Sequence, residues 1–217
     1  MQLQVAPSIL SADFANLGRD IRMLNKAAEI IHLDVMDGTF VPNISFGFPV
    51  IEAVSKIAKI PMDAHLMVVT PHKWFERCAK LGVRMCSFHL EAAGRKTAGN
   101  LKTIRELGMK AGLVINPDIP VEKLFPYIGQ ADFFLIMSVF AGFGGQKFIY
   151  ESLDRVARLK AELDKRGDSA PIEVDGGVSA TNAAALRDAG ATMLVAGSAV
   201  FKAEDPAAAI AAIRNAR

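Results

Sequence analysis

The pattern that decides the fold is already visible in residues 30–59, which read IIHLDVMDGTFVPNISFGFPVIEAVSKIAK. The first part, Ile30–Val35, is a short run of β-branched and aliphatic residues, which predicts a buried strand. The last part, Val50–Lys59, has apolar residues at helical spacing. This stretch therefore predicts one strand that is followed by one helix.

The same strand-then-helix unit recurs along the chain, and 217 residues over eight units give about 27 residues per unit. Parallel strands with right-handed crossovers close into a barrel when eight follow one another, whereas an open doubly wound sheet has about five or six. We therefore expect an α/β fold, a (β/α)8 TIM barrel, as a single domain over residues 1–217. The expected strands are Gln4–Leu10, Ile30–Val35, Pro61–Met67, Met85–Leu90, Ala111–Ile115, Phe133–Val139, Pro171–Val174 and Thr192–Ala196. The expected helices are Leu17–Ala28, Val50–Lys59, Pro71–Leu81, Leu101–Leu107, Val121–Tyr127, Leu153–Arg166, Thr181–Ala189 and Pro206–Ile213.

Composition excludes several classes of protein. The 25 basic and 23 acidic residues nearly balance, with a net charge of +2, which argues against nucleic-acid binding. An apolar run long enough to span a membrane is missing from the sequence, so no membrane partner is expected. Cys78 and Cys86 cannot build a disulfide framework. Met1–Leu10 lacks the pattern of a signal peptide, and we therefore expect a cytoplasmic protein.

Ionisable residues gather at the ends of three expected strands. With period-two alternation, His32 and Asp34 share one face of their strand, and Asp63 and His65 share one face of the next. Asp175 ends a third strand. In a barrel these ends meet at one mouth, where histidines with aspartates form a donor set that Zn²⁺, Fe²⁺, Mn²⁺ or Co²⁺ accepts. A lone buried histidine is more often part of a polar network, but two with matched parity favour a metal site.

Glycine-rich turns follow the last three expected strands. They are Gly142–Gln146, Gly176-Gly177 and Gly197-Ser198. Such turns leave backbone N–H groups open to an anion, and the loops after strands 7 and 8 form the usual phosphate site of this barrel. The first turn matches neither a dinucleotide-binding nor a Walker A motif. A single glycine-rich loop usually only forms a tight turn, but three such loops after adjacent strands favour a phosphate-binding site.

Other residues at the mouth have two interpretations. Inward-facing methionines usually fill gaps in a core, but beside a metal they would form an apolar cover that keeps water away. Ser8 either donates a hydrogen bond to the pocket or caps a turn. We expect His89 and Glu91, which end the fourth strand, to have a structural role. The three methionines are Met36, Met67 and Met137.

Taken together, these motifs resemble the ribulose-phosphate 3-epimerase family essentially from end to end. One motif lies at each of six strand ends, in order along the chain. The motifs are Pro7-Ser8-Ile9-Leu10-Ser11-Ala12-Asp13-Phe14, His32–Asn43, His65-Leu66-Met67, Gly142-Phe143-Gly144-Gly145-Gln146, Val174-Asp175-Gly176-Gly177 and Gly197-Ser198-Ala199-Val200-Phe201.

The resemblance implies a ribulose-phosphate-binding barrel, an isomerase of carbohydrate metabolism that interconverts D-ribulose 5-phosphate and D-xylulose 5-phosphate. The expected setting is the pentose phosphate pathway. The resemblance also implies one divalent metal ion held by His32, Asp34, His65 and Asp175. We expect Zn²⁺ or Fe²⁺ first and Mn²⁺ or Co²⁺ as alternatives. The partners expected are a phosphorylated ketose and further copies of the chain in a homo-oligomer.

The residues expected to bind the substrate come from the same strand ends and loops. They are Ser8, His65, Met36, Met67, Met137, Gly142, Phe143, Gly144, Gly145, Gly176, Gly177, Gly197 and Ser198.

Epimerisation at carbon 3 requires one proton to leave one face and another to arrive at the opposite face. Two carboxylates across the substrate meet this requirement, and Asp34 and Asp175 lie three strands apart in a ring of eight. We expect one to abstract the proton while the other, protonated, returns it. The intermediate is a 2,3-enediolate, whose charge a metal ion stabilises.

Three other functions remain open. A D-allulose 6-phosphate 3-epimerase would use the same site, and Phe140-Ala141, where the family usually has a polar residue and proline, keeps it in consideration. A barrel lyase or decarboxylase would need an Asp-x-Lys-x-x-Asp array, but His65 stands at the lysine and Val68 at the second aspartate. A non-catalytic sugar-phosphate binding barrel is disfavoured by the intact metal set.

Overall fold

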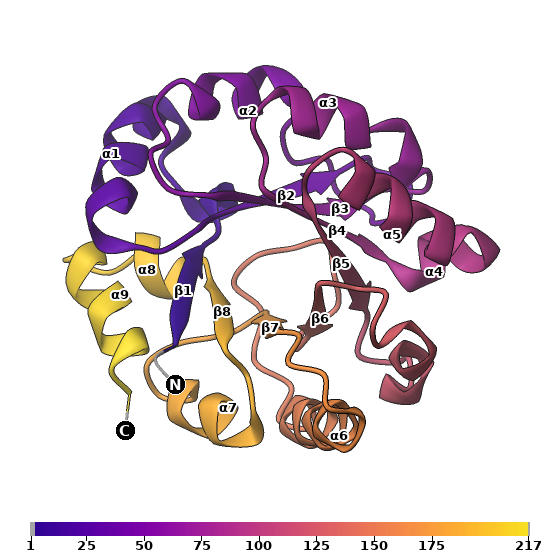
Figure 1. Ribbon diagram of the computed structural model, residues 1–217. Coiled ribbons are helices and arrows are strands. Elements are labelled where there is room, and N and C mark those ends of the chain that lie inside the picture. Colours follow the sequence, from indigo (N-terminus) through magenta and orange to yellow (C-terminus); the bar gives the residue numbers. More distant parts are fainter. Residues whose placement is uncertain (1–2, 217) are drawn as a thin grey trace.

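The computed structural model describes residues 3–216 and shows parallel strands arranged in a ring, with helices outside it (Figure 1). In these residues the eight strands form one sheet in the order β1-β8-β7-β6-β5-β4-β3-β2. The strands are β1 (Gln4–Pro7), β2 (Ile31–Met36), β3 (Met62–Met67), β4 (Met85–His89), β5 (Lys110–Ile115), β6 (Phe133–Met137), β7 (Ile172–Asp175) and β8 (Met193–Ala196).

The ring closes between β1 and β2. A parallel bridge joins Ser8 to His32, and the backbone N–H of Glu29 donates to the carbonyl of Val5 over 3.4 Å. All other neighbouring strands pair in parallel ladders. The predicted α/β barrel is therefore confirmed.

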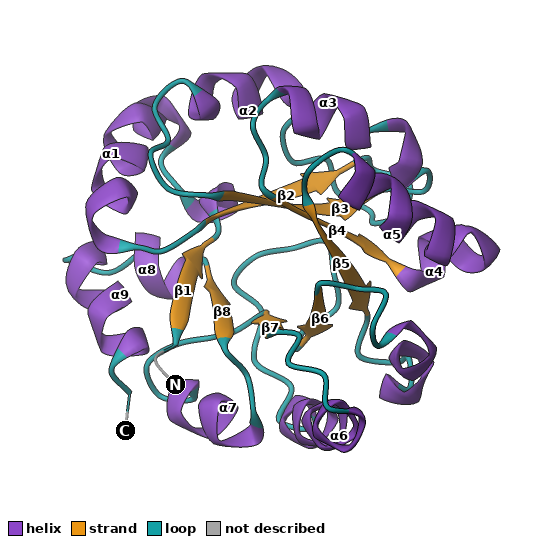
Figure 2. Cartoon of the chain, viewed as in Figure 1, coloured by secondary structure: helices purple, strands orange, loops and turns teal. Residues whose placement is uncertain are grey.

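Helices surround the strands (Figure 2). They bury the side chains that point outward from the strands. Leu33 and Val35 of β2 and Leu66 of β3 pack in this outer layer, as the alternation predicts. Among the described residues, no helix is long and apolar enough to cross a membrane. The helices are α1 (Leu17–Ala27), α2 (Phe48–Ser55), α3 (Phe75–Lys80), α4 (Leu90–Ala93), α5 (Thr97–Glu106), α6 (Ser152–Arg166), α7 (Ala183–Ala189), α8 (Ser198–Phe201) and α9 (Pro206–Arg214).

Several predicted elements differ in type or length. Val121–Tyr127 is a 3₁₀ helix and not an α-helix, because Pro126 lies inside it and lacks the N–H that an α-helical turn needs. The predicted helix Pro71–Leu81 is divided into a 3₁₀ turn, Pro71–Lys73, and α3. The short helices α4 and α8 were not predicted, since four residues carry too little periodicity to be recognised.

Two boundaries also move for local reasons. β1 ends at Pro7, three residues before the predicted end, because the Ser8 hydroxyl accepts from the N–H of Leu10 (3.2 Å) and starts a 3₁₀ turn. α2 begins at Phe48 rather than Val50, because Pro49 is tolerated in a first helical turn.

The inside of the barrel is layered. Its lower layer is apolar, with Ala6, Ile30, Met85, Phe133, Met193 and Val195 packed together. The Phe133 ring lies so close to β5 that a Cβ at Gly112 would stand 2.2 Å from it, so this position requires glycine. The carboxyl ends of the strands carry polar side chains instead, and this end of the barrel holds the site.

Candidate active site

Four ionisable side chains meet at the carboxyl ends of β2, β3 and β7. His32, Asp34, His65 and Asp175 each offer one ligand atom, and these atoms all lie within 4.8 Å of one another. In the β2–β3 register Asp34 stands opposite His65, which brings the two strands' donors together. The structure thus assembles the four residues that the family resemblance implies. We call them the donor cluster.

The donor cluster fits a divalent transition metal. His32 Nε2 and His65 Nδ1 are buried and find no hydrogen-bond partner within residues 3–216. They lie 3.4 and 3.3 Å from Asp34 Oδ1, and 3.9 and 3.6 Å from Asp175 Oδ2. Ligands at 2.0–2.2 Å from a tetrahedral ion stand about 3.3–3.6 Å apart, close to these separations. The geometry therefore supports a possible metal-binding site of histidine and aspartate.

The electrostatics of the donor cluster also favour a cation. Burial opposes charge on His32, but Asp34 and Asp63 outweigh it and raise the pKa of His32 well above its ordinary value. Burial likewise opposes charge on His65, whose pKa is raised by Asp175 and Asp34. Burial disfavours the Asp34 anion, yet the two histidines lower its pKa. The carboxylates therefore stabilise positive charge at the two histidine rings, which is the environment that a cation requires.

Two buried carboxyl groups lie behind His32. Asp63 Oδ2 is 2.8 Å from His32 Nδ1, and Glu173 Oε1 is 3.7 Å from the same nitrogen. Both side chains are completely buried. Burial and the nearby Asp63 raise the pKa of Glu173 well above its ordinary value, which favours its neutral form. Strand parity predicts that Asp63 shares a face with His65, but it carries no signal for the pairing of Asp63 with His32.

His65 also has a partner on its second ring nitrogen. Its Nε2 lies 2.9 Å from Nε2 of His89, at the end of β4. Burial lowers the pKa of His89 to about 4, so this ring is neutral at pH 7. Burial opposes the Glu91 anion, but His89 and a backbone N–H keep the pKa of Glu91 below its ordinary value. A structural role was expected for His89 and Glu91, and the structure places this pair next to His65.

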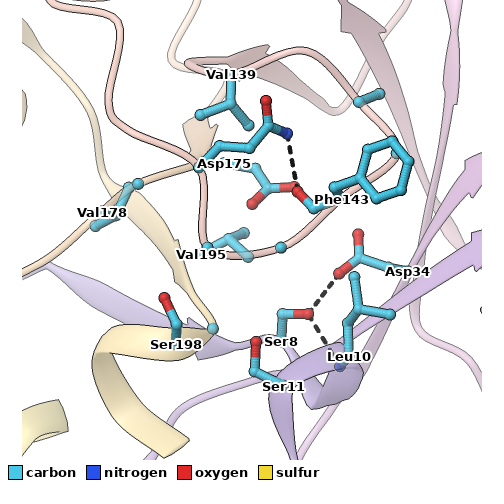
Figure 3. Close-up of a pocket in the computed structure, with 18 of the residues that line it drawn as sticks. Ser8, Leu10, Ser11, Asp34, Val139, Phe143, Asp175, Val178, Val195 and Ser198 are labelled. Atoms are coloured by element: carbon cyan, nitrogen blue, oxygen red, sulfur yellow. Dashed lines mark hydrogen bonds between the residues drawn. The ribbon is translucent and has the colours of Figure 1, made fainter. Parts of the chain in front are cut away.

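A cavity of about 350 Å³ opens above the donor cluster. Asp34 and Asp175 project into it from different strands, with Ser8 beside Asp34 (Figure 3). The Ser8 hydroxyl donates to Oδ2 of Asp34, while Oδ1 faces the cluster. Residues expected from the sequence that line the cavity are Ser8, Asp34, Met36, Met67, Met137, Gly142, Phe143, Gly144, Gly145, Asp175, Gly176, Gly177, Gly197 and Ser198.

His65 is the one expected substrate-binding residue that lies elsewhere. It is completely buried and is absent from the cavity lining, because its Nδ1 turns toward Asp34 and Asp175. A direct substrate contact from His65 therefore stays a prediction, although its side chain does not line the cavity. For the residues that do line the cavity, contact with a substrate stays a prediction.

The glycine loops are held close to one another at the cavity. Gly177 has φ +63°, and a Cβ there would stand 2.6 Å from the backbone nitrogen of Phe148, so a side chain is excluded on both counts. The Gln146 side-chain amide donates to the carbonyls of Phe140 (2.7 Å) and Phe143 (2.9 Å). This clamp shapes the loop after β6.

The lining includes residues that sequence analysis did not assign to the site. Lys202 follows α8. Among the described residues that line the cavity, it is the one with a positively charged side chain. Its position four residues after Ser198 was a usable signal, since the predicted phosphate loop lies just before it. The unassigned residues are Leu10, Ser11, Val139, Phe140, Ala141, Gln146, Val178, Ser179, Val195, Ala199 and Lys202.

Comparison with solved structures supports the fold. The chain resembles a 3-hexulose-6-phosphate synthase with a TM-score of 0.73 at 21% identity, covering 100% of this chain and 99% of that one. It resembles orotidine 5'-phosphate decarboxylase from Pyrococcus horikoshii OT3 with a TM-score of 0.69 at 14% identity, covering 97% of each chain. At these identities the likeness concerns the barrel alone.

Sequence comparison is more specific. The model of the ribulose-phosphate 3 epimerase family matches residues 4–201. A ribulose-phosphate 3-epimerase of Synechocystis sp. is 47% identical over 215 residues, covering 98% of this chain and 94% of the relative. One of Bacillus subtilis (strain 168) is 44% identical over 217 residues, covering 99% and 100%. The chain is therefore an isomerase, and it belongs to the ribulose-phosphate 3-epimerase family.

Proposed function

We propose that this chain interconverts D-ribulose 5-phosphate and D-xylulose 5-phosphate by proton transfer at carbon 3. The observation that carries the proposal is the pair of carboxylates, Asp34 and Asp175, that project into one cavity beside two buried histidines. The names of the relatives support the substrate. The cavity, with glycine-rich loops on one side, supports a small phosphorylated ligand.

Asp34 and Asp175 are the proposed acid and base. They come from β2 and β7, which β1 and β8 separate in the ring, so they approach a bound substrate from different strands. One takes the proton from carbon 3 and the other delivers a proton to the opposite face. Ser8 orients Asp34 through the hydroxyl that it donates to Oδ2. The side chain of Asp175 is 15% exposed, which leaves it open to the cavity.

The donor cluster would hold one divalent metal ion, with Zn²⁺ or Fe²⁺ proposed first and Mn²⁺ or Co²⁺ as alternatives. Bound there, the ion supplies Lewis acidity that stabilises negative charge on the substrate oxygens. A carboxylate alone is too weak a base for a carbon acid, and for this reason the proposal includes the metal. A cation held by the cluster would also offset the cost of burying a carboxylate there.

The phosphate is proposed to lie among the glycine loops. Backbone N–H groups in loops such as Gly176-Gly177 and Gly197-Ser198 suit an anion. Lys202, at the same side of the cavity, adds one positive charge. Holding the phosphate there fixes carbon 3 between the two carboxylates, which removes much of the entropic barrier to proton transfer.

We expect a side-by-side assay to favour the five-carbon sugar. The full chain, loaded with Zn²⁺ or Fe²⁺, is given D-ribulose 5-phosphate and D-allulose 6-phosphate, and kcat/KM is measured for each. We expect ribulose 5-phosphate to be preferred by about tenfold or more, because an extra hydroxymethylene group must find room in the cavity. A preference for allulose 6-phosphate would favour the sister activity. No hydrogen exchange at carbon 3 with either sugar would favour a binding protein.

A further inference from the structure

The second nitrogen of His65 lies at the start of a chain of buried polar groups that leads away from the cavity. His65 Nε2 and His89 Nε2 are 2.9 Å apart, and both side chains are completely buried. On its other side, His89 Nδ1 is 3.5 Å from Oε1 of Glu91 and 3.4 Å from Nδ2 of Asn116. The proposed acid–base chemistry uses none of the last three residues.

The protons in this chain follow from what a metal ligand requires. His65 must present a lone pair on Nδ1, the nitrogen that faces Asp34 and Asp175, so a neutral His65 carries its proton on Nε2. That N–H can donate only if His89 Nε2 accepts. A neutral His89 then carries its own proton on Nδ1 and must donate it onward.

Two neighbours compete for His89 Nδ1, and their chemistry decides between them. The Oδ1 of Asn116 accepts from the N–H of Ala141 (3.0 Å), so its NH₂ group faces His89 and would favour an unprotonated Nδ1. Glu91 would favour a protonated Nδ1, and its Oε1 is fixed by the backbone N–H of Asn116 (3.0 Å). A hydrogen bond to a charged acceptor is about twice as strong as one between neutral groups, so Glu91 prevails.

We propose that His89 and Glu91 are positioning residues that hold His65 in the tautomer and orientation needed for metal binding, an inference that rests on the proposed metal site. Glu91 acts on His65 through His89, as Asp63 acts on His32 directly at 2.8 Å. Each histidine of the donor cluster is thus connected to a carboxylate that is buried or half-buried: His32 directly, and His65 through His89. Such partners fix ring orientation and increase the basicity of the ligand.

The test is the Zn²⁺ affinity of the full chain, measured by competition with a chromogenic chelator at pH 7.5. We expect His89→Leu to weaken binding about 10–100-fold, because the His65 N–H loses its acceptor. His89→Gln should stay within about threefold of wild type, since its carbonyl oxygen can accept the same proton. Glu91→Gln should weaken binding by about tenfold, because the neutral amide no longer outcompetes Asn116. Glu106→Gln, on the exposed face of α5, is the matched control and should leave affinity unchanged.

A role in packing alone would lower the melting temperature of His89→Leu and leave its Zn²⁺ affinity equal to that of wild type, which would overturn the proposal. Should His89→Leu fail to fold, ¹⁵N-histidine spectra of the Zn²⁺-loaded wild-type protein distinguish the same two roles. We expect His65 protonated on Nε2 and His89 on Nδ1; a His89 protonated on Nε2 would contradict the proposal.

Neither readout depends on turnover, so the inference and the proposed function can fail separately. An inactive wild-type protein with the expected affinities and tautomers would overturn the function and support the inference. An active protein whose Zn²⁺ affinity is unchanged by His89→Leu and Glu91→Gln would support the function and overturn the inference. A wild-type protein with no Zn²⁺ at the donor cluster would overturn both the metal proposal and the inference.

Discussion

Replacing Asp175 with asparagine is expected to lower kcat for ribulose 5-phosphate by about 10²–10⁴-fold, and Asp34→Asn is expected to do the same. Asparagine keeps the size of the side chain but can neither accept nor deliver the proton at carbon 3. Both directions of the reaction should suffer, because each aspartate serves as acid in one and as base in the other. Steady-state rates with ribulose 5-phosphate and with xylulose 5-phosphate measure this.

Loss of a metal ligand must be separated from loss of an acid or base. Metal content is therefore measured on each variant by elemental analysis, and rates are compared at full metal occupancy. Asp188→Asn, whose side chain is exposed on α7 and pairs with Arg187, is the matched control and should keep wild-type turnover. Near-full turnover by both Asp34→Asn and Asp175→Asn with metal bound would refute the two-aspartate scheme.

Removal of the metal is expected to have an effect of similar size. A Lewis acid at the donor cluster contributes several kcal/mol to stabilising charge on the substrate, which corresponds to a loss of about 10²–10⁴-fold in kcat on chelation. Chelator-treated protein, dialysed and checked for residual metal, is assayed before and after titration with Zn²⁺, Fe²⁺, Mn²⁺ and Co²⁺. Activity should return with about one equivalent of ion.

Circular dichroism of the stripped protein is the control for unfolding. We expect the barrel to stay folded, because its buried apolar layer does not include the donor cluster. Protein that is verifiably free of metal and still turns over at the wild-type rate would contradict the metal proposal.

Much of the fold and the donor cluster could be predicted because both depend on local pattern. Alternation along β2 placed His32 and Asp34 inward and Leu33 outward, and the structure confirms each orientation. Barrel topology then brings strand ends together wherever they lie in the sequence, so Asp175 could be expected beside β2. The single domain over residues 1–217, the cytoplasmic location and the homo-oligomer stay predictions.

What could not be predicted depends on register and on the reach of side chains. Asp63 lies beside His32 only because the β2–β3 ladder pairs these two positions, and a one-residue slip would separate them. Glu173 comes near the same histidine from β7, across the interior of the barrel. The contact between His65 and His89 likewise joins neighbouring strands through side-chain length. Periodicity within one strand carries no information on these pairs.

The most direct test of the two-aspartate epimerase is the fate of hydrogen at carbon 3 in ²H₂O. Unlabelled ribulose 5-phosphate is converted by the metal-loaded chain, and substrate and product are analysed by mass spectrometry at less than about 10% conversion, so that single turnovers dominate. With two acids on opposite faces, the new proton comes from a carboxyl group that has exchanged with solvent. We expect xylulose 5-phosphate to carry deuterium at carbon 3 from the first turnover, while the remaining ribulose 5-phosphate stays unlabelled. Product that retains the substrate's own hydrogen would show one group serving both faces and would contradict the account.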